Sequence, residues 1–152
     1  MTSACAICDK HRGVGPLVGP RVFADDLVVV SHRPPLPGEQ AAVPGYLFIE
    51  TRRHVRSLSQ LEGHEAAAVA SAAWRAARAL ECELAPAFVF SAIAGRSVPH
   101  FHQHVFVRPA GTPDAVPWND TDAWGERPLL GEQDLDALCA RLATHFPDQG
   151  CR

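Results

Sequence analysis

Three histidines alternate with other residues near the middle of the chain: His100, His102 and His104. If this segment is a strand, its two-residue period places all three imidazoles on one face. Such a row can bind a metal ion, transfer protons or supply a nucleophile. The row is the strongest chemical signal in the sequence, because chance seldom aligns three of only eight histidines in this way.

Strand geometry limits what the row can do. Alternate residues lie ~6.6 Å apart and the outer two ~13 Å apart, whereas zinc binds an imidazole nitrogen at ~2.0 Å. One ion can therefore accept two neighbouring histidines but not all three. A remaining neutral imidazole, held by a carbonyl at one nitrogen, keeps the other nitrogen free as a nucleophile. A neighbouring histidine can donate to a phosphate or a leaving group.

Cys5 and Cys8 form the only close pair among five cysteines. In an intracellular protein, a Cys-x-x-Cys pair is more typical of a metal or redox site than of a disulfide. Two thiolates need two further ligands to close a tetrahedral zinc site. The pair alone therefore indicates zinc without naming its other ligands, and a chance pair near the chain end is the alternative.

Hydrophobic periodicity, proline and glycine define the elements that must position these residues. Residues 59–62 form a Ser-x-x-Glu capping box, which predicts a helix from there to about Leu84 with an alanine-rich inner face. Trp118 and Trp124 favour a functional or packed role for the proline-rich loop 109–128. The remaining elements are predicted strands at 22–23, 27–30, 46–49, 87–93 and 100–107, a loop at 32–44, and a helix at 132–146.

This order of elements predicts an α+β fold with an antiparallel sheet, in one domain spanning residues 1–152. Hydrophobic residues make up 47% and charged residues 20%, as in an ordinary globular protein. A net charge of −3 argues against nucleic-acid binding. No apolar run is long enough for a membrane span. The first ten residues lack the features of a secretory signal, so we expect a soluble, cytoplasmic protein.

The segment Gly95-Arg-Ser-Val-Pro-His-Phe-His-Gln-His-Val-Phe-Val resembles the motif of the histidine-triad (HIT) family, His-x-His-x-His preceded by Gly-Gln-Ser-Val-x. The similarity extends to Asp25–Asp26, to Gly45-Tyr-Leu-Phe-Ile-Glu-Thr-Arg-Arg-His54 and to the alanine-rich helix, and covers about residues 4–109. It implies a HIT-like fold with an antiparallel sheet of about five strands, one long helix and a C-terminal helix.

In that family the middle histidine attacks an α-phosphate and forms a nucleotidyl-histidine, which water or another acceptor resolves. Carried over by position, the resemblance implies that His102 is the nucleophile and that His104 donates to the phosphate and leaving group. It also implies a hydrogen bond from Ser97 to the phosphate, with Gly95 and Arg96 beside it.

Some bacterial relatives, and the related galactose-1-phosphate uridylyltransferases, close a Cys-x-x-Cys zinc site with two histidines. One follows the middle strand, and the other is the first of the triad. The resemblance therefore implies one structural zinc per chain, bound by Cys5, Cys8, His54 and His100, because four protein ligands leave no open position. The other histidines are expected on the surface, namely His11, His32, His64 and His145.

Four residues depart from the family pattern. Arg96 stands where glutamine is usual, and Gln103 replaces a commonly apolar residue. Arg33 stands near the place of an acidic residue that commonly holds ribose hydroxyls, and Tyr46 replaces a frequent histidine. The altered ribose position affects which nucleotides can bind.

Three functions remain open. The first is a nucleotidyl hydrolase or transferase that cleaves a nucleoside phosphate ester, anhydride or phosphoramidate. The second is a zinc-stabilised nucleotide-binding protein with little or no turnover. The third is a metallohydrolase with zinc on the histidine row itself. The expected partner is a nucleotide or a nucleotide conjugate.

A homodimer is also expected, because many HIT-like proteins form two-fold dimers. The predicted long helix carries a second apolar strip beside its core-facing one, and a helix apolar over so much of its surface is usually buried on more than one side. The alternative is that these alanines simply favour helix and face water. The strip consists of Ala66, Ala70, Trp74 and Ala77.

Overall fold

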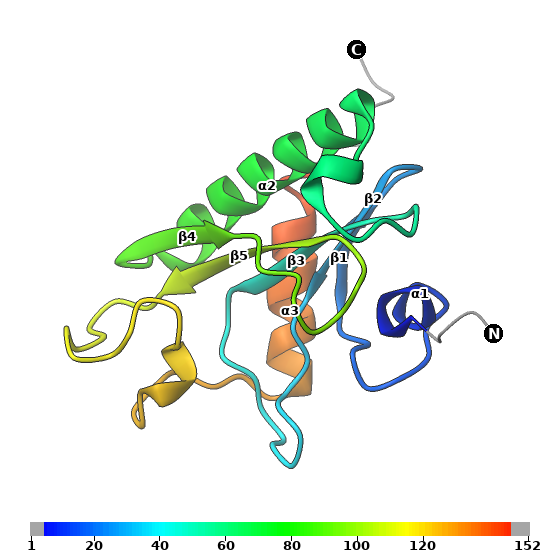
Figure 1. Cartoon of the computed structure of the whole chain (residues 1–152). Coiled ribbons are helices and arrows are strands. Elements are labelled where there is room, and N and C mark those ends of the chain that lie inside the picture. The colour runs from blue at the N-terminus through cyan, green and yellow to red at the C-terminus, as the bar shows by residue number, and fades with distance from the viewer. Residues whose placement is uncertain (1–4, 147–152) are drawn as a thin grey trace.

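A five-stranded antiparallel sheet forms the centre of the computed structural model, which describes residues 5–146 (Figure 1). Its strands are β1 (Arg21–Ala24), β2 (Val28–His32), β3 (Tyr46–Thr51), β4 (Phe88–Ala92) and β5 (His102–Arg108). The helices are α1 (Ala6–His11), α2 (Gly63–Leu84) and α3 (Glu132–Ala143), with 3-10 turns at Leu58–Gln60 and Thr121–Ala123. The strand order β1-β2-β3-β5-β4 places β3 and β5 side by side.

The predicted fold class is confirmed: an α+β arrangement with a five-stranded antiparallel sheet, one long helix and a C-terminal helix. The limits of the predicted domain, residues 1 and 152, lie outside the described residues, so its full extent stays a prediction. Between residues 5 and 146, no helix is long and apolar enough to cross a membrane.

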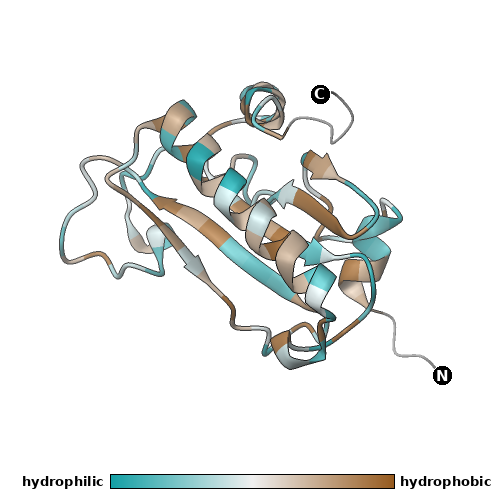
Figure 2. Cartoon of the chain, turned by 90° about the horizontal axis from the view of Figure 1, so that it is seen from above, coloured by the Kyte–Doolittle hydropathy of each residue, from teal (hydrophilic) through white to brown (hydrophobic). Residues whose placement is uncertain are grey.

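Both long helices cover the same face of the sheet, where the core lies. Figure 2 shows α2 lying over the strands, and α3 packs against α2 and β1. Alternate residues of β3, Leu47 and Ile49, are fully buried in this core. The inner face of α2 is thin because it is built largely of alanines such as Ala72 and Ala76, which are also buried. The opposite face of the sheet is left to the loops, to α1 and to the histidines.

The start of α2 differs from the prediction. Ser59 lies in a 3-10 turn, and the helix begins at Gly63 after a capping box formed by Glu62 and Glu65. The carboxylate of Glu65 accepts the backbone N–H of Glu62 at 2.8 Å and also binds the guanidinium of Arg53. This second contact, from a residue outside the helix, selects the later cap.

Gly45 precedes β3 in a left-handed conformation with φ +86°. A Cβ atom there would lie 2.7 Å from Leu84 Cδ1 and 2.8 Å from Val107 Cγ2. We expect Gly45→Ala to lower the free energy of unfolding by about 2–4 kcal/mol, from backbone strain and overpacking together. The matched control is Gly111→Ala, where φ is +83° and the space is open. Equal losses in the two variants, measured by urea unfolding, would contradict the packing argument.

Candidate active site and metal centre

His102 and His104 lie on β5, but His100 does not, so the predicted strand over 100–107 is wrong at its start. The backbone N–H of His100 bonds to the Val98 carbonyl, and that of Phe101 bonds to the Val55 carbonyl at 2.6 Å. These bonds shape the bend at His100, whose side chain is completely buried. The first triad histidine is therefore separated from the other two.

His102 and His104 stand half-buried on the face away from α2, with ring centroids 5.0 Å apart. His102 Nδ1 lies 2.7 Å from the carbonyl oxygen of His100. A carbonyl only accepts, so this nitrogen carries the proton and the ring presents the lone pair of Nε2. Phe48 of β3 packs against both rings, at 6.2 and 5.2 Å between centroids. The arrangement leaves His102 Nε2 able to act as a nucleophile, beside a second imidazole.

His104 is held from β3 by Tyr46, whose Oη lies 2.9 Å from His104 Nδ1. Burial, together with the nearby His102 and Arg33, lowers the pKa of His104 to about 4. The ring is therefore neutral at physiological pH, with one nitrogen as donor and the other as acceptor. A neutral imidazole of this kind can donate one proton and accept another.

Four potential metal ligands, predicted from distant parts of the chain, come together beside this pair. Their donor atoms all lie within 4.8 Å of one another. The Nδ1 atom of His100 is 3.4 Å from Cys5 Sγ and 3.5 Å from Cys8 Sγ, and His54 Nδ1 is 3.4 Å from Cys8 Sγ. The cluster consists of Cys5, Cys8, His54 and His100.

These separations fit a tetrahedral zinc site. Bonds of ~2.3 Å to sulfur and ~2.0 Å to nitrogen give a sulfur–nitrogen edge of about 3.5 Å. His100 donates through Nε2 to the Thr51 carbonyl at 2.7 Å, which leaves Nδ1 free to bind a metal. The predicted cofactor is borne out to this extent: the chain has a four-ligand cluster that can hold one zinc ion. In the described part of the chain, neither His102 nor His104 belongs to such a cluster.

The family model of the HIT domain matches residues 21–111, more than half of the chain. The chain belongs to the HIT family. The match contains β5 with His102 and His104, and two of the four potential zinc ligands, His54 and His100. Cys5 and Cys8 lie ahead of the matched region and extend the site beyond the HIT domain itself.

Solved HIT structures share the fold over almost the whole chain. A zinc-bound histidine-triad family protein from Mycobacterium smegmatis is 19% identical, with a TM-score of 0.68 over 94% of this chain and 95% of that one. A HIT-like protein involved in cell-cycle regulation, from Bartonella henselae, is 14% identical, with a TM-score of 0.65 over 95% and 98%. A hypothetical histidine-triad nucleotide-binding protein from Sulfolobus tokodaii is 15% identical, with a TM-score of 0.66 over 93% and 91%. A comparison with curated proteins finds no match.

His32 was expected on the surface, and that prediction is wrong: its side chain is fully buried at the end of β2. Its Nε2 accepts the backbone N–H groups of Gly45 and Tyr46, and its Nδ1 donates to the carbonyl of Arg33. Burial lowers the pKa of His32 to about 4, so it is a neutral structural residue. It holds the two ends of the 33–45 loop together.

His11 was also expected on the surface and instead forms part of a buried ion-pair cluster. Glu50 of β3 binds Lys10 Nζ at 2.6 Å and His11 Nε2 at 2.9 Å. These contacts attach α1 to the sheet next to His100. The ring centroids of His11 and His100 are 5.6 Å apart. Of the other two histidines, His64 is exposed as predicted, whereas His145 is half-buried and bonded to Glu83.

The loop 109–128 supplies contacts that sequence reasoning missed. Asp122 forms two 2.8 Å hydrogen bonds with the guanidinium of Arg33. Trp118 packs on Phe90 and Phe106, with centroids 5.2 and 6.1 Å away. The tryptophans signalled an ordered loop, but no local pattern connects residues 33 and 122. The loop therefore forms part of the histidine-bearing face.

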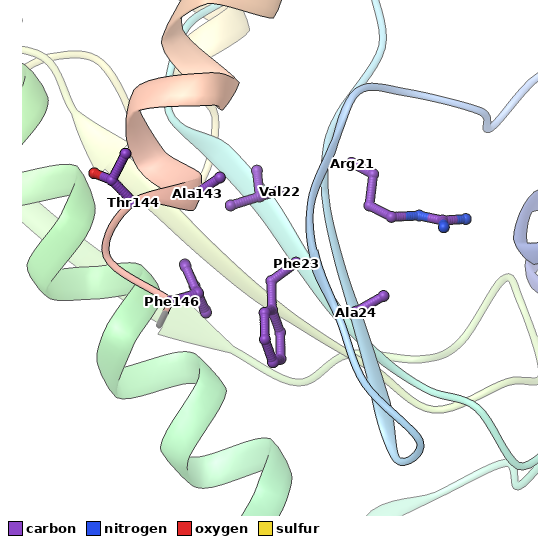
Figure 3. A pocket seen from close by; sticks show the side chains of 7 residues that line it. All are labelled: Arg21, Val22, Phe23, Ala24, Ala143, Thr144 and Phe146. Carbon is purple, nitrogen blue, oxygen red and sulfur yellow. The ribbon is translucent and has the colours of Figure 1, made fainter. Parts of the chain in front are cut away.

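The predicted phosphate-binding residues lie in the turn between β4 and β5. Arg96 and Ser97 are exposed, and Gly95 adopts a φ of +60°. Their proposed role stays a prediction. A hollow elsewhere, between β1 and the end of α3, is bordered by the stacked rings of Phe23 and Phe146 (Figure 3). It contains none of the predicted site residues.

Proposed function

We propose that the protein is a nucleotidyl hydrolase or transferase that cleaves a nucleoside phosphate ester, anhydride or phosphoramidate through a nucleotidyl-histidine. Membership of the HIT family supports a nucleotide substrate. The observation that carries the proposal is the 2.7 Å hydrogen bond from His102 Nδ1 to the His100 carbonyl, which aims a free Nε2 lone pair away from the core.

In the first step, His102 Nε2 attacks the α-phosphorus, a P–N bond forms and the bond to the leaving group breaks. The leaving group takes a proton from His104, which stands two residues along the same face. In the second step, water attacks the phosphorus and gives its proton to His104, the P–N bond breaks, and the nucleoside monophosphate is released. Two moderate steps replace one difficult displacement.

The turn before β5 supplies the phosphate contacts in this proposal. Ser97 donates a hydrogen bond, and Arg96 contributes a fixed positive charge to the developing anion. Gly95 adopts a positive φ in this turn, a conformation that glycine takes without strain. The present exposure of Ser97 and Arg96 leaves them free to bind a ligand.

One structural zinc per chain completes the proposal, bound by Cys5, Cys8, His54 and His100. The metal would crosslink the N-terminal segment to the sheet through its four ligands. It would have no open coordination position for substrate. By fixing His100, it would also fix the carbonyl that holds His102.

The first test is a screen of nucleotide conjugates for hydrolysis. The second is to trap the nucleotidyl-histidine adduct without exposing it to acid and to measure the mass of the intact chain. We expect the mass of the chain to increase by that of one nucleotidyl group, with the group attached to His102.

The alternative function, a zinc-stabilised nucleotide-binding protein with little turnover, is favoured by the pairing of Arg33 with Asp122 at the altered ribose position. Tight nucleotide binding without adduct or hydrolysis would support that alternative.

We also propose a homodimer through α2. Ala70 and Trp74 are exposed on this helix, and Trp74 is 58% accessible. In a two-fold interface a single change counts twice, so Ala70→Arg is expected to convert the dimer to a monomer. Light scattering at micromolar concentration gives the measurement, with Ser71→Arg on a neighbouring exposed position as the control. A monomeric unmodified protein would contradict the prediction.

A further inference from the structure

A chain of contacts leads from the loop 109–128 to the imidazole of His104. Asp122 binds the guanidinium of Arg33 through both oxygens, each at 2.8 Å. The guanidinium lies over the ring of Tyr46, 4.4 Å from its centroid. Tyr46 Oη then lies 2.9 Å from His104 Nδ1. Arg33 and Tyr46 are two of the four departures from the family pattern, and here they contact each other.

The hydrogen bond between Tyr46 and His104 has a preferred direction. A phenol is a donor as well as an acceptor, and the nitrogen of a neutral imidazole is a good acceptor. A cation over the ring makes the phenol a stronger donor, and the charge of Arg33 acts in that direction. Across the described residues, Tyr46 Oη has no other hydrogen-bond partner. If His104 donated instead, the phenolic proton would have no acceptor in a half-buried position.

We propose that Tyr46 is a positioning residue, which donates its phenolic proton to His104 Nδ1 and so keeps the proton of His104 on Nε2. The Arg33–Asp122 pair holds the phenol in place. This inference rests on the proposed function, because Nε2–H is the group that donates to the leaving group. His102 and His104 then carry opposite tautomers: one offers a lone pair at Nε2, the other a proton.

The tautomer of His104 can be read without substrate, by nitrogen-15 NMR of the histidine side chains at neutral pH. We expect Nδ1 to be unprotonated in the unmodified protein. In Tyr46→Phe the preference should be lost, and both tautomers should be populated. Protonated Nδ1 in the unmodified protein, or an unchanged spectrum in Tyr46→Phe, would overturn the proposal. This result does not depend on whether the protein turns over any nucleotide.

The matched control is Ser91→Ala, which removes a hydroxyl that bonds to the backbone carbonyl of His104 at 2.9 Å rather than to its ring. It should leave the tautomer unchanged. With a substrate in hand, Tyr46→Phe should lower kcat about 10- to 100-fold and change KM less, because the donor acts in the transition state. Asp122→Asn keeps the phenol of Tyr46 and weakens only the Arg33–Asp122 pair that holds it. The fall in kcat should therefore be smaller than in Tyr46→Phe. A kcat for Tyr46→Phe equal to that of Ser91→Ala would also overturn the proposal.

Discussion

Replacing His102 with alanine is expected to lower turnover by more than about 10³-fold, because it removes the proposed nucleophile. The fold should survive, since His102 is half-buried on an open face and contributes nothing to the core. The measurement pairs steady-state hydrolysis of the best conjugate with a thermal melt of the same sample.

Two companion variants separate the role of His102 from a general loss of histidine. His104→Ala should reduce the rate less, about 10- to 100-fold, since it removes a proton donor and not the nucleophile. His64→Ala removes an exposed imidazole at the start of α2 and should have no effect. Activity of His102→Ala within tenfold of the unmodified protein would refute the assignment.

Removal of zinc should produce the second large effect, a fall in melting temperature of about 10 °C or more. Metal binding free energy is folding free energy wherever the ligands meet only in the folded chain. Cys8 and His54 are 46 residues apart, and Cys5 and His100 are 95 apart, so the site forms only on folding. A stabilisation of several kcal/mol, at about 2–4 °C per kcal/mol, gives the expected shift.

The experiment compares untreated protein, chelated protein and the Cys5→Ser/Cys8→Ser double variant. Cys82→Ser makes the same chemical change at an exposed position in a second potential metal group, formed by Cys82, Glu83 and His145, and so shows whether that group holds the zinc instead. Metal analysis should give one zinc per chain, lost in the double variant and kept in Cys82→Ser and His102→Ala. Absence of metal from reduced protein purified without chelator would count against the site. Zinc lost in His102→Ala would favour the metallohydrolase instead.

The pairing of His102 with His104 on one face could be predicted from sequence because the period of a strand is local. His102 and His104 are two residues apart, and any strand places them on one face. The position of His100 was not predictable in the same way. It depends on the bond between Phe101 and the Val55 carbonyl, which joins segments 46 residues apart, so that β5 begins only at His102.

Contacts between distant polar residues explain the other differences. The surface prediction for His32 was the default for a histidine outside the recognised motifs, but the backbone N–H groups that its ring accepts belong to residues 13 and 14 positions later. The cap of α2 moved from Ser59 to Glu62 because Arg53 binds Glu65. In each case the sequence contains the partners, and only the tertiary structure identifies them.

The contact between Arg33, Tyr46 and Asp122 also constrains how this sequence could have evolved. An acidic residue restored at position 33 alone would face the Asp122 carboxylate at a site where both side chains are mostly buried, with exposures of 16% and 26%. Two carboxylates held together there would repel. An acidic residue at position 33 should therefore cost less stability when position 122 changes with it than when position 33 changes alone. Covariation of positions 33, 46 and 122, rather than any one of them, would mark the branch of the family that shares this arrangement.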